Sequence, residues 1–93
     1  MIYTINRLVN LQTLDISGDC GVGDKGLRRL TGLTYLYASN NPKIQNINHL
    51  KHLKILFAEG NCGINDDGIK ELKNLVTLNS DENDKITRKL VVK

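Results

Sequence analysis

One apolar pattern recurs along the chain at nearly constant spacing. The clearest copy begins at residue 53, and its apolar positions are Leu53, Leu56, Ala58, Ile64, Ile69 and Leu72. Equivalent patterns begin at Leu11, Leu33 and Leu75, so the four copies start at nearly equal intervals. Self-similarity at a fixed period predicts a solenoid, in which each copy forms one layer and stacks on its neighbours.

Each copy opens with apolar and polar residues in alternation, which is typical of a short strand with one buried side. The predicted strands are Thr13–Ser17, Tyr35–Ser39, Ile55–Glu59 and Thr77–Asp81. Because successive strands run in the same direction, they need crossover connections and form a parallel sheet. In the first and third copies, Asp24 and Asp67 precede an apolar stripe and predict helices with an aspartate as N-cap.

The predicted fold class is α/β: a solenoid with a curved parallel sheet on its concave face and short helices or turns on its convex face. The second copy is shorter and contains Asn41-Pro42, which predicts a tighter turn with a short helix. The last copy ends in a truncated helix over residues 85–93. We expect a single domain, with residues 1–10 as a partial repeat that covers the first layer, and four full repeats at 11–32, 33–52, 53–74 and 75–93.

Two repeats continue with a cysteine motif, Cys20-Gly-Val-Gly-Asp-Lys-Gly-Leu-Arg-Arg-Leu and Cys62-Gly-Ile-Asn-Asp-Asp-Gly-Ile-Lys-Glu-Leu. This motif resembles the cysteine-containing class of the leucine-rich repeat family, and the resemblance covers essentially all of residues 2–90. Pro42 and Asp84 replace the cysteine in the other two repeats, so the array mixes classes. The resemblance implies a horseshoe segment that binds other proteins on its concave sheet.

Several residues that often carry chemistry have structural interpretations here. Cys20 and Cys62 lie two strands apart, and a strand spacing of about 4.8 Å separates their thiols by roughly 10 Å. That separation excludes a disulfide or a shared zinc ion and favours two buried, reduced thiols. Asn41, Asn61 and Asn83, beside the cysteine position, are predicted to bind backbone groups at the turn.

No catalytic, metal or cofactor site is predicted. His49 and His52 are three positions apart, but no Cys, Asp or Glu is placed to complete a metal site with them. The glycines between residues 18 and 26 precede no Gly-Lys-Ser/Thr sequence and therefore form no phosphate loop. Nothing in the sequence resembles a nucleophile paired with a base, so an enzyme is the least favoured class.

The informative positions are those that alternate with the inward-facing residues of the strands and so face outward from the sheet. They form three rows: Thr13, Tyr35, Ile55, Thr77; then Asp15, Tyr37, Phe57, Asn79; then Ser17, Ser39, Glu59, Asp81. Three of the four aromatic residues lie in these rows, on two adjacent strands. Contiguous apolar surface of this kind marks interfaces, although cross-strand pairs can also serve only to stabilise a sheet.

The sequence therefore predicts a non-catalytic protein–protein interaction module. Its predicted partner-binding residues are the anchors Tyr35, Tyr37, Ile55 and Phe57, with Asp15, Asn79, Glu59, Asp81 and Glu82 as a polar rim. A first alternative is a structural protein that pairs two copies, as a homodimer, through the same surface or through the ends of the array. A remote alternative is nucleic-acid binding by basic residues of the crossovers, Arg28, Arg29, Lys51, Lys70 and Lys73. The net charge of +3 comes from residues spread along the chain and does not by itself argue for nucleic-acid binding, which usually needs a concentrated basic face.

The expected compartment is intracellular and cytoplasmic. No stretch approaches the roughly 20 apolar residues of a membrane span, and the first residues lack the basic and apolar regions of a signal peptide. An intracellular chain keeps its cysteines reduced. The abundance of Asn, Lys and Ile is a bias of AT-rich genomes, such as those of protists and large DNA viruses.

Overall fold

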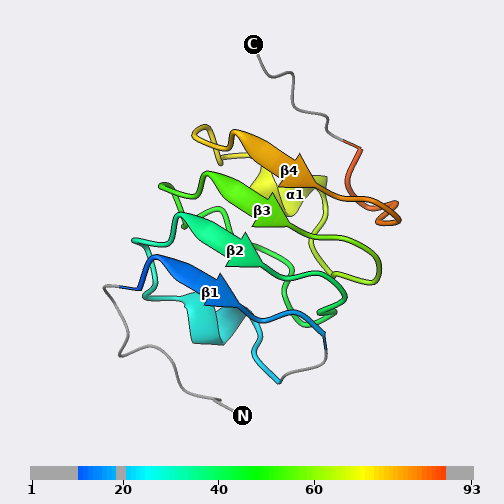
Figure 1. Ribbon diagram of the computed structural model, residues 1–93, viewed down its shortest axis with the longest axis horizontal. Coiled ribbons are helices and arrows are strands. Elements are labelled where there is room, and N and C mark those ends of the chain that lie inside the picture. Colours follow the sequence, from blue (N-terminus) through cyan, green and yellow to red (C-terminus); the bar gives the residue numbers. More distant parts are fainter. Residues whose placement is uncertain (1–10, 19–20, 88–93) are drawn as a thin grey trace.

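The computed structural model describes residues 11–18 and 21–87 and contains a four-stranded parallel sheet (Figure 1). The strands are β1 (Thr13–Asp15), β2 (Tyr35–Tyr37), β3 (Ile55–Phe57) and β4 (Thr77–Asn79). They lie in the order β1-β2-β3-β4, so each strand pairs with the next one along the chain. The fold is therefore α/β with a consecutive parallel sheet and little helix.

The four strands begin at the predicted residues but end two positions earlier than predicted. Three positions after each strand, the backbone takes a positive φ, at Gly18, Asn40, Gly60 and Glu82. The residues between still bond across the sheet: Ile16 N donates to Tyr37 O and Ala38 N donates to Phe57 O, both at 2.8 Å. The strands are short because the left-handed residue turns each chain segment away soon after the third strand position.

Short helical turns cover the buried side of the sheet at two places, η1 (Asp24–Leu27), a 3₁₀ turn, and α1 (Asp66–Ile69) (Figure 1). The N-cap of α1 is Asn65, whose Oδ1 accepts from Gly68 N at 2.8 Å. The predicted N-caps, Asp24 and Asp67, were wrong. Both aspartates lie inside their turns, and Gly23 precedes η1 without a side-chain cap bond.

The crossover after β2 contains turns and no helix within residues 38–54, so the predicted short helix there was wrong. Its amide groups bond to neighbouring crossovers instead: Gln45 N donates to Asp24 Oδ1 at 2.8 Å, and Ile47 N donates to Gly68 O at 2.9 Å. These donors are therefore unavailable for helical bonds. The predicted partial repeat at 1–10, Cys20 and all but residues 85–87 of the predicted last helix lie outside the described residues, and residues 85–87 are not helical.

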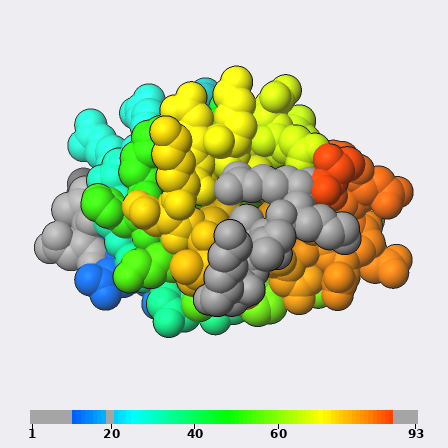
Figure 2. All heavy atoms as spheres, turned by 90° about the horizontal axis from the view of Figure 1, so that it is seen from above, coloured from blue at the N-terminus to red at the C-terminus, as the bar shows by residue number. Residues whose placement is uncertain are grey.

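A continuous apolar core lies between the sheet and the crossovers, built from the recurring leucines and isoleucines of the sequence pattern. Its fully buried large side chains are Leu27, Leu30, Leu33, Leu36, Ile44, Ile47, Leu50, Leu53, Leu56, Ile64, Ile69 and Leu72. Leu14 on β1 and Leu78 on β4 are only partly buried, because each lies on an outer strand of the sheet. In the space-filling view, the yellow segment lies toward the top and the orange segment toward the right (Figure 2).

Two buried asparagines join neighbouring crossovers. Asn41 Nδ2 donates to Ile16 O at 2.8 Å and to Val22 O at 3.0 Å. Asn83 Nδ2 makes the same two bonds, to Ala58 O at 2.8 Å and Ile64 O at 3.2 Å. The predicted backbone-binding role is thus confirmed for both. Asn41 lies in the second predicted repeat and Asn83 in the fourth, so the same set of bonds recurs in every second repeat.

The turn after β3 differs from the turns after β2 and β4. Asn61, at the position of Asn41 and Asn83, is exposed, and the adjacent Cys62 is fully buried. Burial raises the pKa of the Cys62 thiol, as expected for a cysteine that packs as a small apolar side chain. The predicted burial of Cys62 is therefore confirmed. The prediction that the Asn61 side chain binds backbone groups at the turn was wrong, since among the described bonds Asn61 only donates its backbone N–H to Asn40 Oδ1.

Candidate partner-binding surface

Two of the three predicted outward-facing rows are present in the register of the sheet, and the third lies just beyond the strand ends. Tyr35 pairs with Thr13 on one side and with Ile55 on the other, and Tyr37 pairs in the same way with Asp15 and Phe57. Thr77 and Asn79 of β4 complete the two rows. Since the residues between them, such as Leu36 and Leu56, are fully buried, these side chains project from the opposite side of the sheet. We call this side the outer sheet face.

Four apolar side chains form a contiguous group at the centre of this face, which we call the aromatic patch: Tyr35, Tyr37, Ile55 and Phe57. The rings of Tyr37 and Phe57 pack against each other, with centroids 5.0 Å apart and planes tilted by 35°. Such pairs stabilise a structure by roughly 0.5–1.5 kcal/mol beyond their buried area. Tyr35 remains 40% exposed beside them.

Beyond the aromatic patch, the third row is polar. Ser39 Oγ donates to Glu59 Oε1 at 3.3 Å and accepts from Glu59 N at 3.1 Å, which holds both side chains against the end of β3. Asp81 is exposed on the neighbouring segment, and its carbonyl accepts from Gly60 N at 2.9 Å. Glu82, the next residue, is exposed as well.

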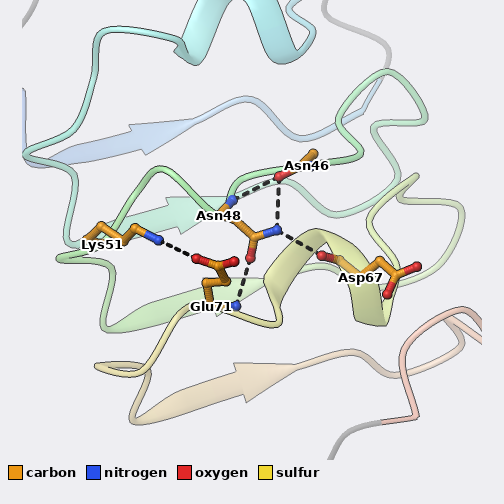
Figure 3. A network of polar contacts seen from close by, with 5 residues as sticks. All are labelled: Asn46, Asn48, Lys51, Asp67 and Glu71. Carbon is orange, nitrogen blue, oxygen red and sulfur yellow. Dashed lines mark hydrogen bonds and ion pairs between the residues drawn. The ribbon is translucent and has the colours of Figure 1, made fainter.

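Among the described residues, the crossovers carry both signs of charge, whereas the three outward-facing rows carry only acidic charges. The three outward-facing rows carry Asp15, Glu59 and Asp81 and no lysine or arginine. The basic residues of the crossovers lie elsewhere: Lys51 Nζ, for example, is 3.0 Å from Glu71 Oε1 (Figure 3). That hydrogen bond lowers the pKa of Glu71. Because the pair is exposed, it contributes little to stability.

The polar network of the crossovers serves the fold. Asn48 Oδ1 accepts from Glu71 N at 2.8 Å, while its Nδ2 donates to Asp67 O at 2.8 Å and to Asn46 Oδ1 at 3.1 Å (Figure 3). Both Asn48 bonds to the following crossover use backbone groups. Asn48 therefore joins two crossovers in the way Asn41 does, a role that the sequence pattern does not predict because Asn48 lies outside the recurring positions.

Asp24 and Asp66 also join neighbouring crossovers. Asp24 accepts from Gln45 N and, through Oδ2, from Asn46 N at 3.2 Å. Asp66 accepts from Thr87 N at 2.9 Å, and this bond is the counterpart, two repeats further on, of the bond between Asp24 and Gln45 N. These carboxylates satisfy backbone donors of the next crossover and are not arranged as a catalytic pair.

The histidines do not converge on a metal site. His49 Nε2 lies 2.8 Å from Leu27 O, and because a carbonyl only accepts, this nitrogen carries the proton and donates. Within residues 11–18 and 21–87, no group of three or more His, Cys, Asp or Glu side chains could hold a metal ion. A hollow of about 290 Å³ beside His49 is lined by Asp24, Lys25, Arg28 and Asn46. It lies on the crossovers and contains none of the predicted partner-binding residues.

Comparison of the chain with family models, curated proteins and solved structures finds no match. Across the part of the chain that the structure describes, no helix is both long enough and apolar enough to cross a membrane. The function of the outer sheet face therefore has to be argued from its own residues.

Proposed function

We propose that this chain is a leucine-rich repeat solenoid that binds a protein partner on the outer sheet face without catalysis. Each predicted repeat supplies one strand, and the strands pair in chain order, which is the arrangement such a solenoid requires. The bonds of Asn41 recur two repeats later at Asn83, and this recurrence also supports a repeating architecture. In this proposal the outer sheet face is the concave face.

The aromatic patch is the observation that carries the binding function. Cross-strand packing accounts for Tyr37 and Phe57, which contact each other. It does not account for Tyr35, which is 40% exposed beside them. Large aromatic side chains are enriched at protein interfaces, where they bury much area and lose little conformational entropy. The proposed partner buries Tyr35 and the exposed edges of Ile55, Tyr37 and Phe57.

Selection of displayed random peptides on the wild-type protein tests this proposal. Selected peptides would be synthesised, and their affinities measured for the wild type, for Tyr35→Ser/Tyr37→Ser and for Val76→Ser. Val76 is 55% exposed and lies outside the patch, so its variant controls for loss of an exposed apolar side chain. We expect the double variant to bind at least roughly tenfold more weakly, as for removal of interface anchors, and the control to bind as the wild type. Equal affinities for all three proteins would refute the proposal.

A homodimer is the second candidate. β4 is the last strand in the sheet order, no described strand pairs with its outer edge, and Val76 beside it is exposed. Unpaired strand edges favour association with another chain. Light scattering of the wild type and of Tyr37→Ala/Phe57→Ala distinguishes the possibilities. A monomer at high micromolar concentration excludes the dimer, and a variant that stays dimeric places the interface at the strand edge.

A further inference from the structure

We infer that the partner presents an extended segment in which a bulky apolar residue and a lysine or arginine are two positions apart. This inference rests on the proposed function and adds the chemistry of the bound segment. The first reason is the sign of the charge on the outer sheet face. Its charged side chains in the described rows are all acidic, although the whole chain has a net charge of +3.

The acidic residues border the aromatic patch on two sides. Asp15 pairs with Tyr37 in the sheet register, so it lies at the β1 side of the patch. Glu59 follows Phe57 by two positions, and Asp81 lies next to it, because Gly60 N bonds to Asp81 O. Residues two apart along a strand are separated by roughly 6.6 Å, and adjacent strands by about 4.8 Å. An apolar side chain bound on the aromatic patch therefore lies roughly 5–7 Å from the position of an acidic residue.

These carboxylates have no basic neighbour in the described part of the outer sheet face. The side-chain bond of Glu59 is to the neutral hydroxyl of Ser39, whereas Glu71 on the crossovers is paired with Lys51. Like charges on neighbouring strands repel each other. A cationic group placed between Glu59 and Asp81 would reduce this repulsion, while an anionic group would increase it.

The spacing of the two required side chains follows from the sheet. In an extended segment, residues two apart face the same side and lie roughly 6.6 Å from each other. This equals the expected separation of the Phe57 and Glu59 positions. The stem of a lysine or arginine can pack on an aromatic ring while its charged head reaches a carboxylate. A segment that runs parallel to the strands with the order apolar-x-basic therefore fits the patch and its acidic border together, and an anionic phosphate backbone does not.

Three synthetic peptides test the inference. They are blocked at both ends and are identical except for a central Leu-x-Arg, Leu-x-Glu or Ser-x-Arg. Binding would be followed by the amide chemical shifts of the protein, which also locate the bound peptide. Two neutralised proteins complete the design: Glu59→Gln/Asp81→Asn on the outer sheet face, and Glu71→Gln/Asp67→Asn on the crossovers, which removes the same two charges elsewhere.

We expect the Leu-x-Arg peptide to bind the wild type at least roughly threefold more tightly than either other peptide at low salt, as for partly exposed ion pairs. The preference over Leu-x-Glu should vanish in Glu59→Gln/Asp81→Asn and persist in the crossover variant. It should also fall as salt rises, because the screening length shortens from about 10 Å at 0.1 M to about 3 Å at 1 M.

Two results overturn the inference and differ in what they say about the proposed function. If Leu-x-Glu binds as tightly as Leu-x-Arg, or if peptides selected at random need Tyr37 and Phe57 but lack basic residues, the inference fails and the proposed function stands. The inference also fails if the Leu-x-Arg peptide does not bind the wild type, or if it binds Tyr37→Ala/Phe57→Ala with the same affinity. If the randomly selected peptides likewise bind without needing the aromatic patch, the proposed function fails as well.

Discussion

The side-chain amide of Asn41 donates to the carbonyl of Ile16, in the preceding repeat, at 2.8 Å. The same amide reaches Val22 O, and its Oδ1 accepts from Lys43 N at 3.0 Å. A buried polar side chain is tolerated when its donors and acceptors are satisfied in this way. Asn41 therefore ties two successive crossovers to each other through their backbones.

Loss of this amide should be costly. In Asn41→Ala, the bonds to Ile16 O and Val22 O are lost, and Val22 O loses this donor inside the protein; an unsatisfied buried group costs roughly 1–3 kcal/mol. Asn61→Ala is the matched control, since Asn61 occupies the same repeat position and is exposed; we expect a change within about 0.5 kcal/mol. Urea denaturation measures both. Equal losses for the two variants would contradict the assignment of Asn41 as a structural tie.

Glycine at position 68 is required by the close approach of another crossover. A Cβ added there would lie 2.0 Å from Gln45 O, a backbone atom that cannot move aside cheaply. Gly68→Ala should therefore destabilise the fold by roughly 1–3 kcal/mol or more. At Gly23 the nearest atom, Lys43 O, would be 3.3 Å away, so Gly23→Ala should cost clearly less. Thermal melts of the two variants, compared with the wild type, check the order.

The destabilisation caused by a core substitution should depend on whether its strand lies inside or at the end of the sheet. Leu56 on β3 is fully buried, whereas Leu78 on β4 is partly buried at the edge of the core. Leu→Ala in a core costs roughly 2–5 kcal/mol, and least where little area was buried. Leu56→Ala should therefore lower the free energy of unfolding more than Leu78→Ala. A larger loss for Leu78→Ala in denaturant melts would argue against β4 as an outer strand.

The Cys62 thiol should be unreactive in the folded protein. Burial raises its pKa, so the thiolate, which is the reactive form, is scarcer than for a free cysteine. In a Cys20→Ser variant, a thiol reagent should label Cys62 only after denaturant is added. Because the pKa of Cys62 is higher in the folded than in the unfolded protein, its protonated thiol contributes to the free energy of unfolding in full below the unfolded pKa. That contribution is lost as the pH rises from the unfolded pKa through the folded pKa. Rapid labelling without denaturant would contradict the burial of Cys62.

Glu82 occupies a backbone conformation that favours glycine. Its φ is 64°, and the equivalent positions hold Gly18, Asn40 and Gly60. A left-handed conformation costs most residues roughly 1–2 kcal/mol, which exceeds the entropic cost of glycine. Glu82→Gly should therefore stabilise the protein by up to about 1 kcal/mol, as measured in urea melts. Glu82→Ala removes the same carboxylate but keeps the strain, so it should bring no gain. A gain in both variants would point to charge rather than backbone conformation.

The placement of the strands and of the outward-facing rows was predictable because each depends on local alternation. Leu36 and Leu56 mark the inward side, and the residues on either side of each must then face outward. The ends of the strands were not predictable in this way. They depend on left-handed residues whose identities differ, since Glu82 stands where Gly18 and Gly60 stand in other repeats.

The crossovers were predicted less well because their conformation depends on distant partners. The absence of a helix after β2 reflects bonds from Gln45 N to Asp24 and from Ile47 N to Gly68 O, both of which lie on other crossovers. No local propensity reports such bonds. The exposure of Tyr35 likewise could not be read from the alternation, which predicts the side of the sheet but not how neighbouring rings cover one another.

In the proposed solenoid, the bonds of Asn41 and Asn83 define a unit larger than one repeat. The side-chain amides of Asn41 and Asn83 reach back into the preceding predicted repeat, whereas Asn61, at the same position of the repeat between them, bonds back only through its backbone N–H among the described bonds. In the proposed solenoid, the structural unit is then a pair of repeats, one with a buried asparagine at the turn and one without. Duplication or deletion of a whole pair would conserve these ties, whereas removal of residues 33–52 alone would delete Asn41 and take this donor from Ile16 O. A solenoid of this kind should therefore gain or lose repeats two at a time.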